Sequence, residues 1–255
     1  MLDASIPSLL AEDRPGPLGL LAGKALKIGY RLTGLNRYDN FRLERVRDLA
    51  VLVIPGVANP KLLRTGAFFA AEIDTRAIGA GAAVLDMGTG SGVCALVAAR
   101  HARRVIAVDV SAAAVRCARL NAALNELEER IEVRQGDLFA PVAGERFDLV
   151  LFNPPFLLGA PKNDRDAAWR SEDAARRFAA GLSEHLAPDG AALVLLSSFG
   201  DACALYESEL RANGFRLEVF ARRRFLNETL TIVRATSSRR AEPRAAPPRQ
   251  PEQRA

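Results

Sequence analysis

Histidine, cysteine and tryptophan are scarce in this chain of 255 residues, which contains two His, three Cys and one Trp. Neither His101 nor His185 lies beside a carboxylate cluster or a nucleophile motif, so a zinc site or a histidine-dependent triad has almost no material. The cysteines are scattered and lack metal-ligand spacing. We expect Cys94, Cys117 and Cys203 to be small core residues. The sequence therefore predicts no metal site.

Long apolar runs are missing too. Stretches such as 191–199 are far shorter than the ~20 residues that a membrane-spanning helix requires. The first ten residues include Asp3 and no basic side chain, which is unlike a secretory signal. We expect a cytoplasmic protein with no membrane contact.

Positive charge is unevenly spread along the chain. The formal net charge is +5, and residues 236–255, with five Arg and two Glu, supply +3 of it. The remaining body is nearly neutral, which argues against a broad nucleic-acid-binding face. A local patch or the basic tail could still contact an anionic partner.

Prolines, glycines and apolar runs divide the chain into three parts. Residues 1–48 are punctuated by Pro and Gly and interleaved with basic residues, and we interpret them as an N-terminal extension, either a lid or a substrate-recognition element. Residues 49–235 have the composition of one α/β domain. Residues 236–255, rich in Pro, Arg, Gln and Ala, are predicted to be disordered.

Short apolar runs alternate with helical segments from residue 83 onward, which is typical of successive βαβ units. Two further strands follow the last helix, and they predict a β-hairpin that closes the edge of the sheet. The expected strands lie near 84–85, 104–108, 131–134, 147–152, 191–198, 215–221 and 229–235, and the main helices near 92–101, 111–124, 172–187 and 201–213.

A glycine-rich turn follows the first of these strands, in the run from Val84 to Gly92. Glycine has no Cβ and tolerates positive φ, so such a turn lets the backbone approach a cofactor closely. The dinucleotide fingerprint would need its third glycine at position 93, which is Val, and no Lys-Ser/Thr pair follows to make a phosphate-binding loop. The alternative is a turn with no ligand. The candidate cofactor contacts here are Asp86, Gly88, Thr89, Gly90 and Gly92.

Acidic residues end or follow the next two strands. Asp109 lies seventeen positions beyond Gly92, where an α/β nucleotide site puts a carboxylate on the ribose hydroxyls; otherwise it merely terminates its strand. Asp137 could accept a hydrogen bond from an adenine amino group, or cap the short turn that follows it. The residues after these acids, Val110 and Leu138, complete the candidate cofactor contacts.

The fourth strand runs into Asn153, Pro154, Pro155 and Phe156, which we take as the candidate catalytic motif. Two consecutive prolines fix φ and bias Asn153 toward an extended backbone, so its side chain projects at a defined angle. Its oxygen and the Pro154 carbonyl could accept both N–H groups of a planar nitrogen, and orientation of this kind accelerates a reaction strongly. Asn153 also borders the expected cofactor. Phe156 would stack on the flat substrate group; the alternative is a stiff loop that only ends the strand.

In their order, these motifs resemble the class I S-adenosylmethionine-dependent methyltransferases, specifically the branch that modifies amide or exocyclic amino nitrogens. The resemblance covers about residues 50–235 and rests on the glycine loop, Asp109, Asp137 and the Asn153 motif. It implies a Rossmann-like, doubly wound, seven-stranded sheet with an antiparallel edge hairpin. It also implies S-adenosyl-L-methionine as the cofactor, lying over the strand ends.

Downstream segments, at 167–169, 188–190 and 221–225, look most like the HemK-type glutamine N5-methyltransferases. That likeness implies a protein glutamine amide as the substrate, for example in a translation factor. Two departures keep other substrates open: HemK-type enzymes usually carry Tyr where this chain has Phe156, and an acidic residue near Thr65. Phe at that position is common among ribosomal-RNA guanine N2-methyltransferases. RNA or DNA amino-group methylation, a small-molecule acceptor, and a non-catalytic cofactor-binding protein are the alternatives.

Overall fold

The computed structural model describes residues 40–73 and 77–238. A seven-stranded sheet with the order β10-β11-β9-β6-β3-β4-β5 forms its centre. Six of these strands run in the same direction, and β11, between β9 and β10, is antiparallel to both of its neighbours. The predicted Rossmann-like sheet with an edge hairpin is confirmed. Its strands are β3 (Ala83–Met87), β4 (Arg104–Asp109), β5 (Ile131–Gln135), β6 (Phe147–Phe152), β9 (Leu186–Ser197), β10 (Phe215–Arg224) and β11 (Thr229–Ser237).

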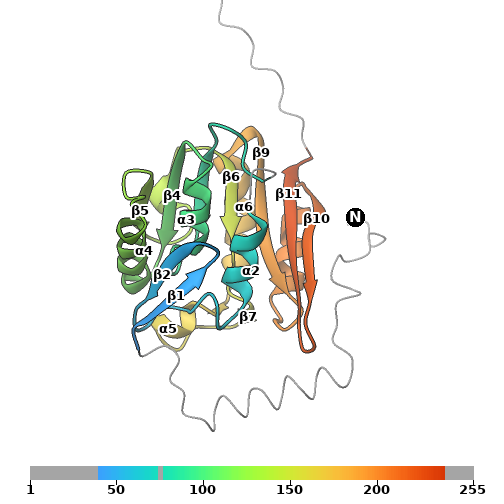
Figure 1. Cartoon of the computed structure of the whole chain (residues 1–255). Helices are drawn as coiled ribbons and strands as arrows, with labels where there is room; N and C mark the ends of the chain where they lie inside the picture. The colour runs from blue at the N-terminus through green and yellow to red at the C-terminus, as the bar shows by residue number, and fades with distance from the viewer. Residues whose placement is uncertain (1–39, 74–76, 239–255) are drawn as a thin grey trace, which may run out of the picture.

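Helices cover both faces of this sheet. In Figure 1, α2, α3 and α4 lie on the near side, and α6 and α7, which pack against each other, lie behind it. The helices are α2 (Thr65–Glu72), α3 (Val93–Ala99), α4 (Ala112–Leu124), α5 (Asp164–Ala167), α6 (Ala174–His185) and α7 (Cys203–Ala212), with a 3-10 turn, η2, at Ala140–Val142. No helix within the described ranges is both long and apolar enough to cross a membrane.

Two-sided cover explains why the central strands are continuous apolar runs rather than alternating ones. Val105 to Val108 of β4 are all at most 1% exposed. On the side of α6 and α7, the ring of Phe152 packs against Phe178 at 4.4 Å and edge-on against Tyr206 at 5.9 Å. Cys94, Cys117 and Cys203 are buried and unpaired, which confirms their prediction as core residues.

The first strand is not predicted from the sequence. Residues 1–48 are expected to form an irregular extension, but β1 (Arg42–Val46) pairs antiparallel with β2 (Leu49–Val53). The boundary proposed at 48/49 therefore falls in the turn of a hairpin. The other predicted extension and tail residues, 1–39 and 239–255, lie outside the described residues.

Two asparagines of α4 hold the β1–β2 hairpin against the domain. Asn121 is fully buried; its Oδ1 accepts from the N–H of Leu52 at 2.7 Å, and its Nδ2 donates to the carbonyl of Leu52 at 2.7 Å. Asn125, one turn later, bonds both backbone groups of Ala50. The two amides thus replace a neighbouring strand for β2. Asn121 also donates to the carbonyl of Ser91 at 2.8 Å, which ties the hairpin to the glycine-rich turn.

Candidate functional site

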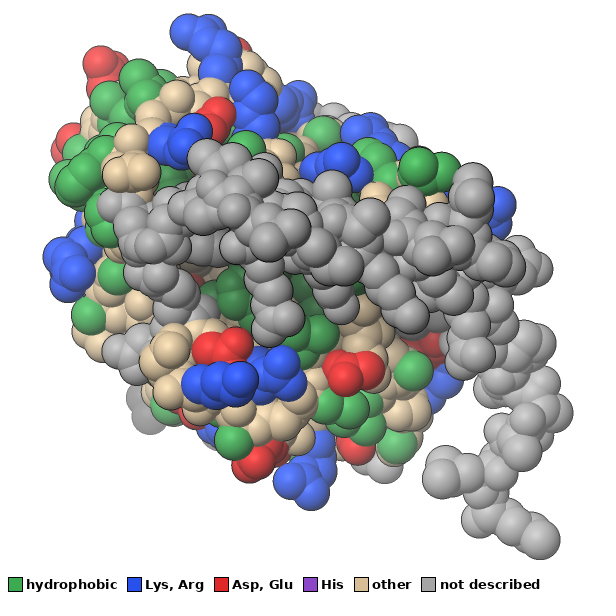
Figure 2. All heavy atoms as spheres, turned by 90° about the horizontal axis from the view of Figure 1, so that it is seen from below, with side chains coloured by type: hydrophobic (Ala, Val, Ile, Leu, Met, Phe, Trp, Pro, Cys, Tyr) green, Lys and Arg blue, Asp and Glu red, His purple; other side chains and the backbone are tan. Residues whose placement is uncertain are grey.

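A cleft of about 440 Å³ lies at the carboxyl ends of the parallel strands, where open α/β sheets bind ligands. Figure 1 places these strand ends at the lower edge of the sheet, together with α5 and β7 (Leu157–Leu158), and Figure 2 views the molecule from that side. On the described part of this face, hydrophobic side chains lie beside separate groups of acidic and basic ones.

The glycine-rich turn between β3 and α3 forms one wall of the cleft. Its Gly90 has φ +57°, and a Cβ added there would meet only the Gly88 carbonyl, at 4.0 Å, so the surface above it is open to a ligand. Gly92 has φ +82°, but its added Cβ would lie 3.1 Å from the Cα of Ala118. Gly92 therefore permits close packing of α4, and it is not among the residues that line the cleft.

Asp86 lies under this turn and is only 4% exposed. Its Oδ2 accepts from the Thr89 hydroxyl at 2.6 Å and from the N–H of Ala95 at 3.0 Å. Burial raises the pKa of Asp86 to about 7, and these two hydrogen bonds offset part of that rise. The carboxylate of Asp86 therefore holds the turn in place, and Asp86 also lines the cleft.

At the end of β4, Asp109 binds the turn from the other side. Its Oδ2 accepts from the N–H of Gly90 at 2.9 Å, and its Oδ1 from the N–H of Ser111 at 2.9 Å. Burial raises the pKa of Asp109, against the effect of these bonds. The next side chain, Val110, is 57% exposed and presents an apolar surface at the cleft.

The turn after β5 carries Asp137 into the cleft. Gly136 donates its N–H to the carbonyl of Asp109 at 3.0 Å, which fixes the two acidic turns side by side. The Oδ2 of Asp137 accepts from the guanidinium of Arg177 on α6, and Arg177 lines the cleft as well. Leu138 has φ +46°, a strained value for a branched side chain, and it borders the same space.

The motif after β6 forms the opposite end of the cleft. The Oδ1 of Asn153 is buried and has no hydrogen-bond partner in the described part of the chain. Pro154 and Pro155 line the cleft beside it. Phe156 also lines it but is only 6% exposed, so it offers little ring surface for stacking. Its carbonyl accepts from the N–H of Ala202 at 3.0 Å, which anchors the motif to the segment before α7.

A two-stranded ribbon covers the motif. After β7 the chain forms α5 and returns as β8 (Arg170–Ser171), parallel to β7. The N–H of Leu157 donates to the carbonyl of Trp169 at 2.8 Å, and Trp169 lines the cleft. We call the end of the cleft that contains Asn153 and Phe156 the acceptor end. Trp169 gives this end an apolar cover.

Segment 56–66, which leads from β2 into α2 and also lines the cleft, is not among the site residues that the sequence predicts. Asn59 shapes it: the buried Oδ1 accepts from the N–H groups of Lys61 and Leu62, both at 3.0 Å. The Asn-Pro pair at 59–60 is a turn signal that could have marked this loop. Nothing in the local pattern could have shown that it returns to the cleft.

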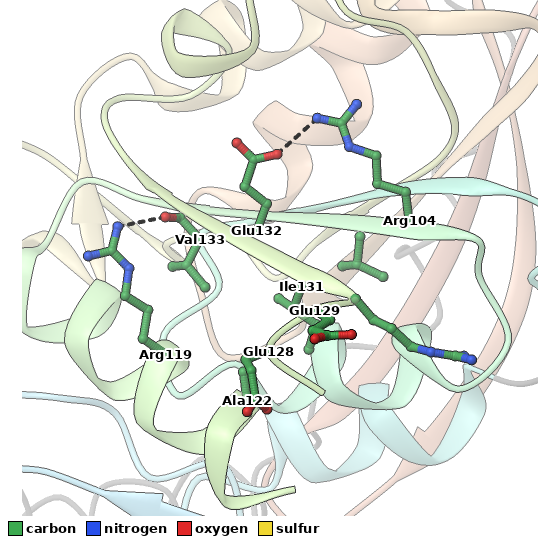
Figure 3. Close-up of a pocket in the computed structure, with 10 residues that line it drawn as sticks. Arg104, Arg119, Ala122, Glu128, Glu129, Ile131, Glu132 and Val133 are labelled. Carbon is green, nitrogen blue, oxygen red and sulfur yellow. Dashed lines mark hydrogen bonds and ion pairs between the residues drawn. The ribbon is translucent and has the colours of Figure 1, made fainter. Parts of the chain in front are cut away.

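Another groove, of about 560 Å³, lies at the β5 edge (Figure 3). Arg104 and Ile131, which line it, begin β4 and β5, so the groove is at the amino ends of the strands. Two of its arginines already have partners: Arg104 bonds Glu132 at 2.9 Å, and Arg119 donates to the carbonyl of Val133 at 2.8 Å. None of the predicted site residues reaches it, so the cleft at the carboxyl ends remains the candidate site.

Folding brings nearly all the predicted site residues together. The exception is Gly92, whose contact is with α4. The predicted site residues that line the cleft at the carboxyl ends are Asp86, Gly88, Thr89, Gly90, Asp109, Val110, Asp137, Leu138, Asn153, Pro154, Pro155 and Phe156.

With this fold and this cleft, the chain belongs to the methyltransferase small domain family, whose model matches residues 51–221. It is 38% identical over 121 residues to the ribosomal protein uL3 glutamine methyltransferase of Bradyrhizobium diazoefficiens, covering 42% of this chain and 38% of that one. It is 37% identical over 190 residues to ribosomal RNA small subunit methyltransferase C of Alcanivorax borkumensis, covering 74% and 54%. The predicted likeness to glutamine methyltransferases is confirmed.

The chain spans about half the length, or less, of these curated relatives. Among solved structures, it shares its fold with the 16S rRNA N2 G1207 methyltransferase of T. thermophilus, determined in complex with AdoMet and guanosine. The TM-score is 0.58 at 20% identity, over 78% of this chain and 50% of that one.

Proposed function

We propose that this chain is an S-adenosylmethionine-dependent N-methyltransferase whose acceptor is a planar nitrogen, with a protein glutamine amide as the first candidate. The observation that carries the proposal is the buried, unpartnered Oδ1 of Asn153 in the same cleft as the glycine-rich turn. A buried acceptor without a partner is costly, so its retention at this point favours a ligand that brings an N–H group.

The other end of the cleft suits an adenosyl ligand. The open surface over Gly90 admits close approach, and Asp109 keeps lone pairs for ribose hydroxyls beside its two backbone bonds. Asp137 would accept from the adenine amino group, and exposed Val110 would cover an apolar face of the ring. When bound, S-adenosylmethionine supplies an electrophilic methyl group on a positively charged sulfur.

The acceptor motif would act by orientation. Asn153 Oδ1 and the Pro154 carbonyl each accept one N–H of the acceptor, which turns the nitrogen lone pair toward the methyl group. The new N–C bond forms as the S–C bond breaks, and the surplus proton on nitrogen then leaves to water. No general base has to act first, which agrees with a cleft that contains neither of the chain's histidines.

A transfer assay with methyl-labelled S-adenosylmethionine on a cell extract tests this function. The labelled extract is divided into a nuclease-treated and a protease-treated half. Label that survives nuclease and disappears with protease supports the glutamine amide. Label in neither macromolecule identifies a small acceptor if a labelled metabolite forms, and no transfer at all contradicts the enzymatic function.

A second candidate, an amino group of RNA, is favoured by a basic cluster beside the acceptor end. We call residues 222–228, which end β10 and lead into β11, the hairpin tip. Its exposed Arg224 stands beside Arg223, and its Phe225 lies under the guanidinium of Arg64 at 5.0 Å. Arg64 separates Leu63 and Thr65, which both line the cleft. The ribosomal-RNA relative also matches the larger share of this chain.

The hairpin tip supports this second candidate because nucleic-acid affinity depends on neutralising phosphates. If RNA is the substrate, Arg64→Gln together with Arg224→Gln should weaken RNA binding. The slope of log binding constant against log salt concentration should also become shallower, by roughly 1–2 units. Arg216→Gln, at the far end of β10, is the matched control. Unchanged salt dependence in the double variant would remove the hairpin tip as support for an RNA substrate.

A further inference from the structure

One cation in the cleft has no part in the function described so far. Arg177, in the first turn of α6, donates to Asp137 Oδ2 and lies 3.6 Å from Asp173 Oδ1. All three side chains line the cleft. An ion pair therefore joins α6 to the turn in which adenine is expected to bind.

Tight packing holds Arg177 at this place. A Cβ added to Gly181, one turn further along α6, would lie 2.7 Å from the ring of Phe139, so the helix lies directly on the turn after β5. Phe178 stacks on the same ring at 5.6 Å. Because Phe139 follows Asp137 by two residues, this packing keeps the guanidinium within reach of the carboxylate.

The ion pair itself is open to water. The side chains of Arg177 and Asp137 are 46% and 51% exposed, and pairs of this kind contribute little to stability. A purine ring lying against them would exclude water and strengthen the interaction. The pair therefore matters more to a bound ligand than to the fold.

We infer that Arg177 is a positioning residue for the cofactor, which holds Asp137 by Oδ2 and so directs Oδ1 to the amino group of adenine. The inference rests on the proposed use of S-adenosylmethionine. It assigns adenine recognition to α6 as well as to the turn after β5, although α6 follows the acceptor motif in the chain. The guanidinium touches no reacting atom, so it affects cofactor affinity and not the chemical step.

Binding of S-adenosylhomocysteine, measured by calorimetry on the full chain, tests this inference. The second ligand is the analogue of S-adenosylhomocysteine that lacks the 6-amino group. Arg177→Met should weaken binding of S-adenosylhomocysteine about tenfold, as expected for a misaligned hydrogen bond to a charged group, and change binding of the analogue by less than about twofold. In turnover, KM for S-adenosylmethionine should rise by a similar factor while kcat stays within about twofold.

Matched variants separate positioning from general damage. Arg176→Met removes the exposed neighbouring cation on α6 and should change neither ligand's affinity. Arg177→Lys should restore part of the discrimination between the two ligands. Equal weakening of both ligands by Arg177→Met, or no weakening of either, would overturn the inference alone. Failure of the unmodified chain to bind S-adenosylhomocysteine would overturn the proposed cofactor, and this inference with it.

Discussion

The two ends of the cleft differ in how completely their buried polar groups are bonded. Under the glycine-rich turn, Asp86 and Asp109 each accept two hydrogen bonds, and buried Asn121 makes three to backbone groups. At the acceptor end, the buried Oδ1 of Asn153 has no partner among the described residues. The first end is bonded within the protein, and the second keeps a buried acceptor for which the proposed substrate would supply the partner.

This difference separates two ways of preparing a site. A network whose members are all bonded fixes the backbone before a ligand arrives, so little ordering remains to be done on binding. An unpaired buried acceptor costs about 1–3 kcal/mol, and a substrate N–H group recovers that free energy when it binds. The cofactor end should therefore respond to substitution through stability and affinity, and the acceptor end through turnover.

The largest effect is expected for Asn153→Ala. Loss of the oriented acceptor should lower kcat by about a thousandfold, near the upper end of what one preorganised group contributes. Affinity for S-adenosylmethionine should stay within about threefold. The melting temperature should not fall, because the substitution removes an unsatisfied polar atom. Turnover and thermal melting are the measurements.

Asn213→Ala, at the end of α7, is the control for this variant. Its exposed side chain only donates to the carbonyl of Glu209, so turnover should not change. Full turnover in Asn153→Ala would contradict the orientation mechanism. A large fall in its melting temperature would mean that Oδ1 stabilises the folded protein after all.

Asn121→Leu should do the reverse and act on stability. The change leaves the N–H of Leu52 and the carbonyl of Ser91 without this partner, and the carbonyl of Leu52 with only the thiol of Cys117, at a cost of about 3 kcal/mol. The melting temperature should fall by roughly 6–12 °C. Asn125→Leu, at a residue that is only partly buried whereas Asn121 is fully buried, should have a smaller effect. Equal effects would show that burial of the first amide is not what matters.

Asp109→Ala tests the cofactor end through affinity. The variant loses a ribose acceptor and releases the N–H of Gly90, so S-adenosylhomocysteine should bind about thirtyfold more weakly, or about 2 kcal/mol. Asp148→Ala is the matched control, since that carboxylate also accepts a backbone N–H, from Ala83 at 2.8 Å, but at the opposite ends of the strands. Calorimetry should find its affinity within about twofold of the unmodified chain.

How far the sequence predicts this molecule depends on the range of the signal. Apolar runs are a local signal, and the strands and helices expected from them are present. The strand β1 was missed because its alternation is weak and Phe41 and Leu43, both 69% exposed, do not mark a buried face. What makes it part of the domain is Asn121, whose bonds to β2 span 69 positions in the sequence.

The same limit applies to the site. The glycine loop, Asp109 and the Asn153 motif each follow a strand, so the rule for strand ends places them together. The position of Gly92 shows that a glycine in such a motif can serve packing, since its neighbour is Ala118. Arg177 could not be recognised, because an arginine on an amphipathic helix looks like a solvated surface residue until α6 packs on Phe139.

The smallest effect is the pH dependence of stability and cofactor affinity at the cofactor end. Burial raises the pKa of Asp86 from its ordinary value of 3.8 to about 7, so the folded protein holds this proton more tightly than the unfolded chain. Its contribution to the free energy of unfolding therefore falls as pH rises from about 4 to about 7, and is constant above. A cationic cofactor favours the ionised carboxylate, so S-adenosylmethionine should bind up to about tenfold more weakly at pH 6 than at pH 7.5. Asp86→Asn keeps an oxygen that can accept from Thr89 and Ala95, and its affinity for S-adenosylmethionine should lose most of this pH dependence. If the pH dependence persists, a group other than Asp86 titrates.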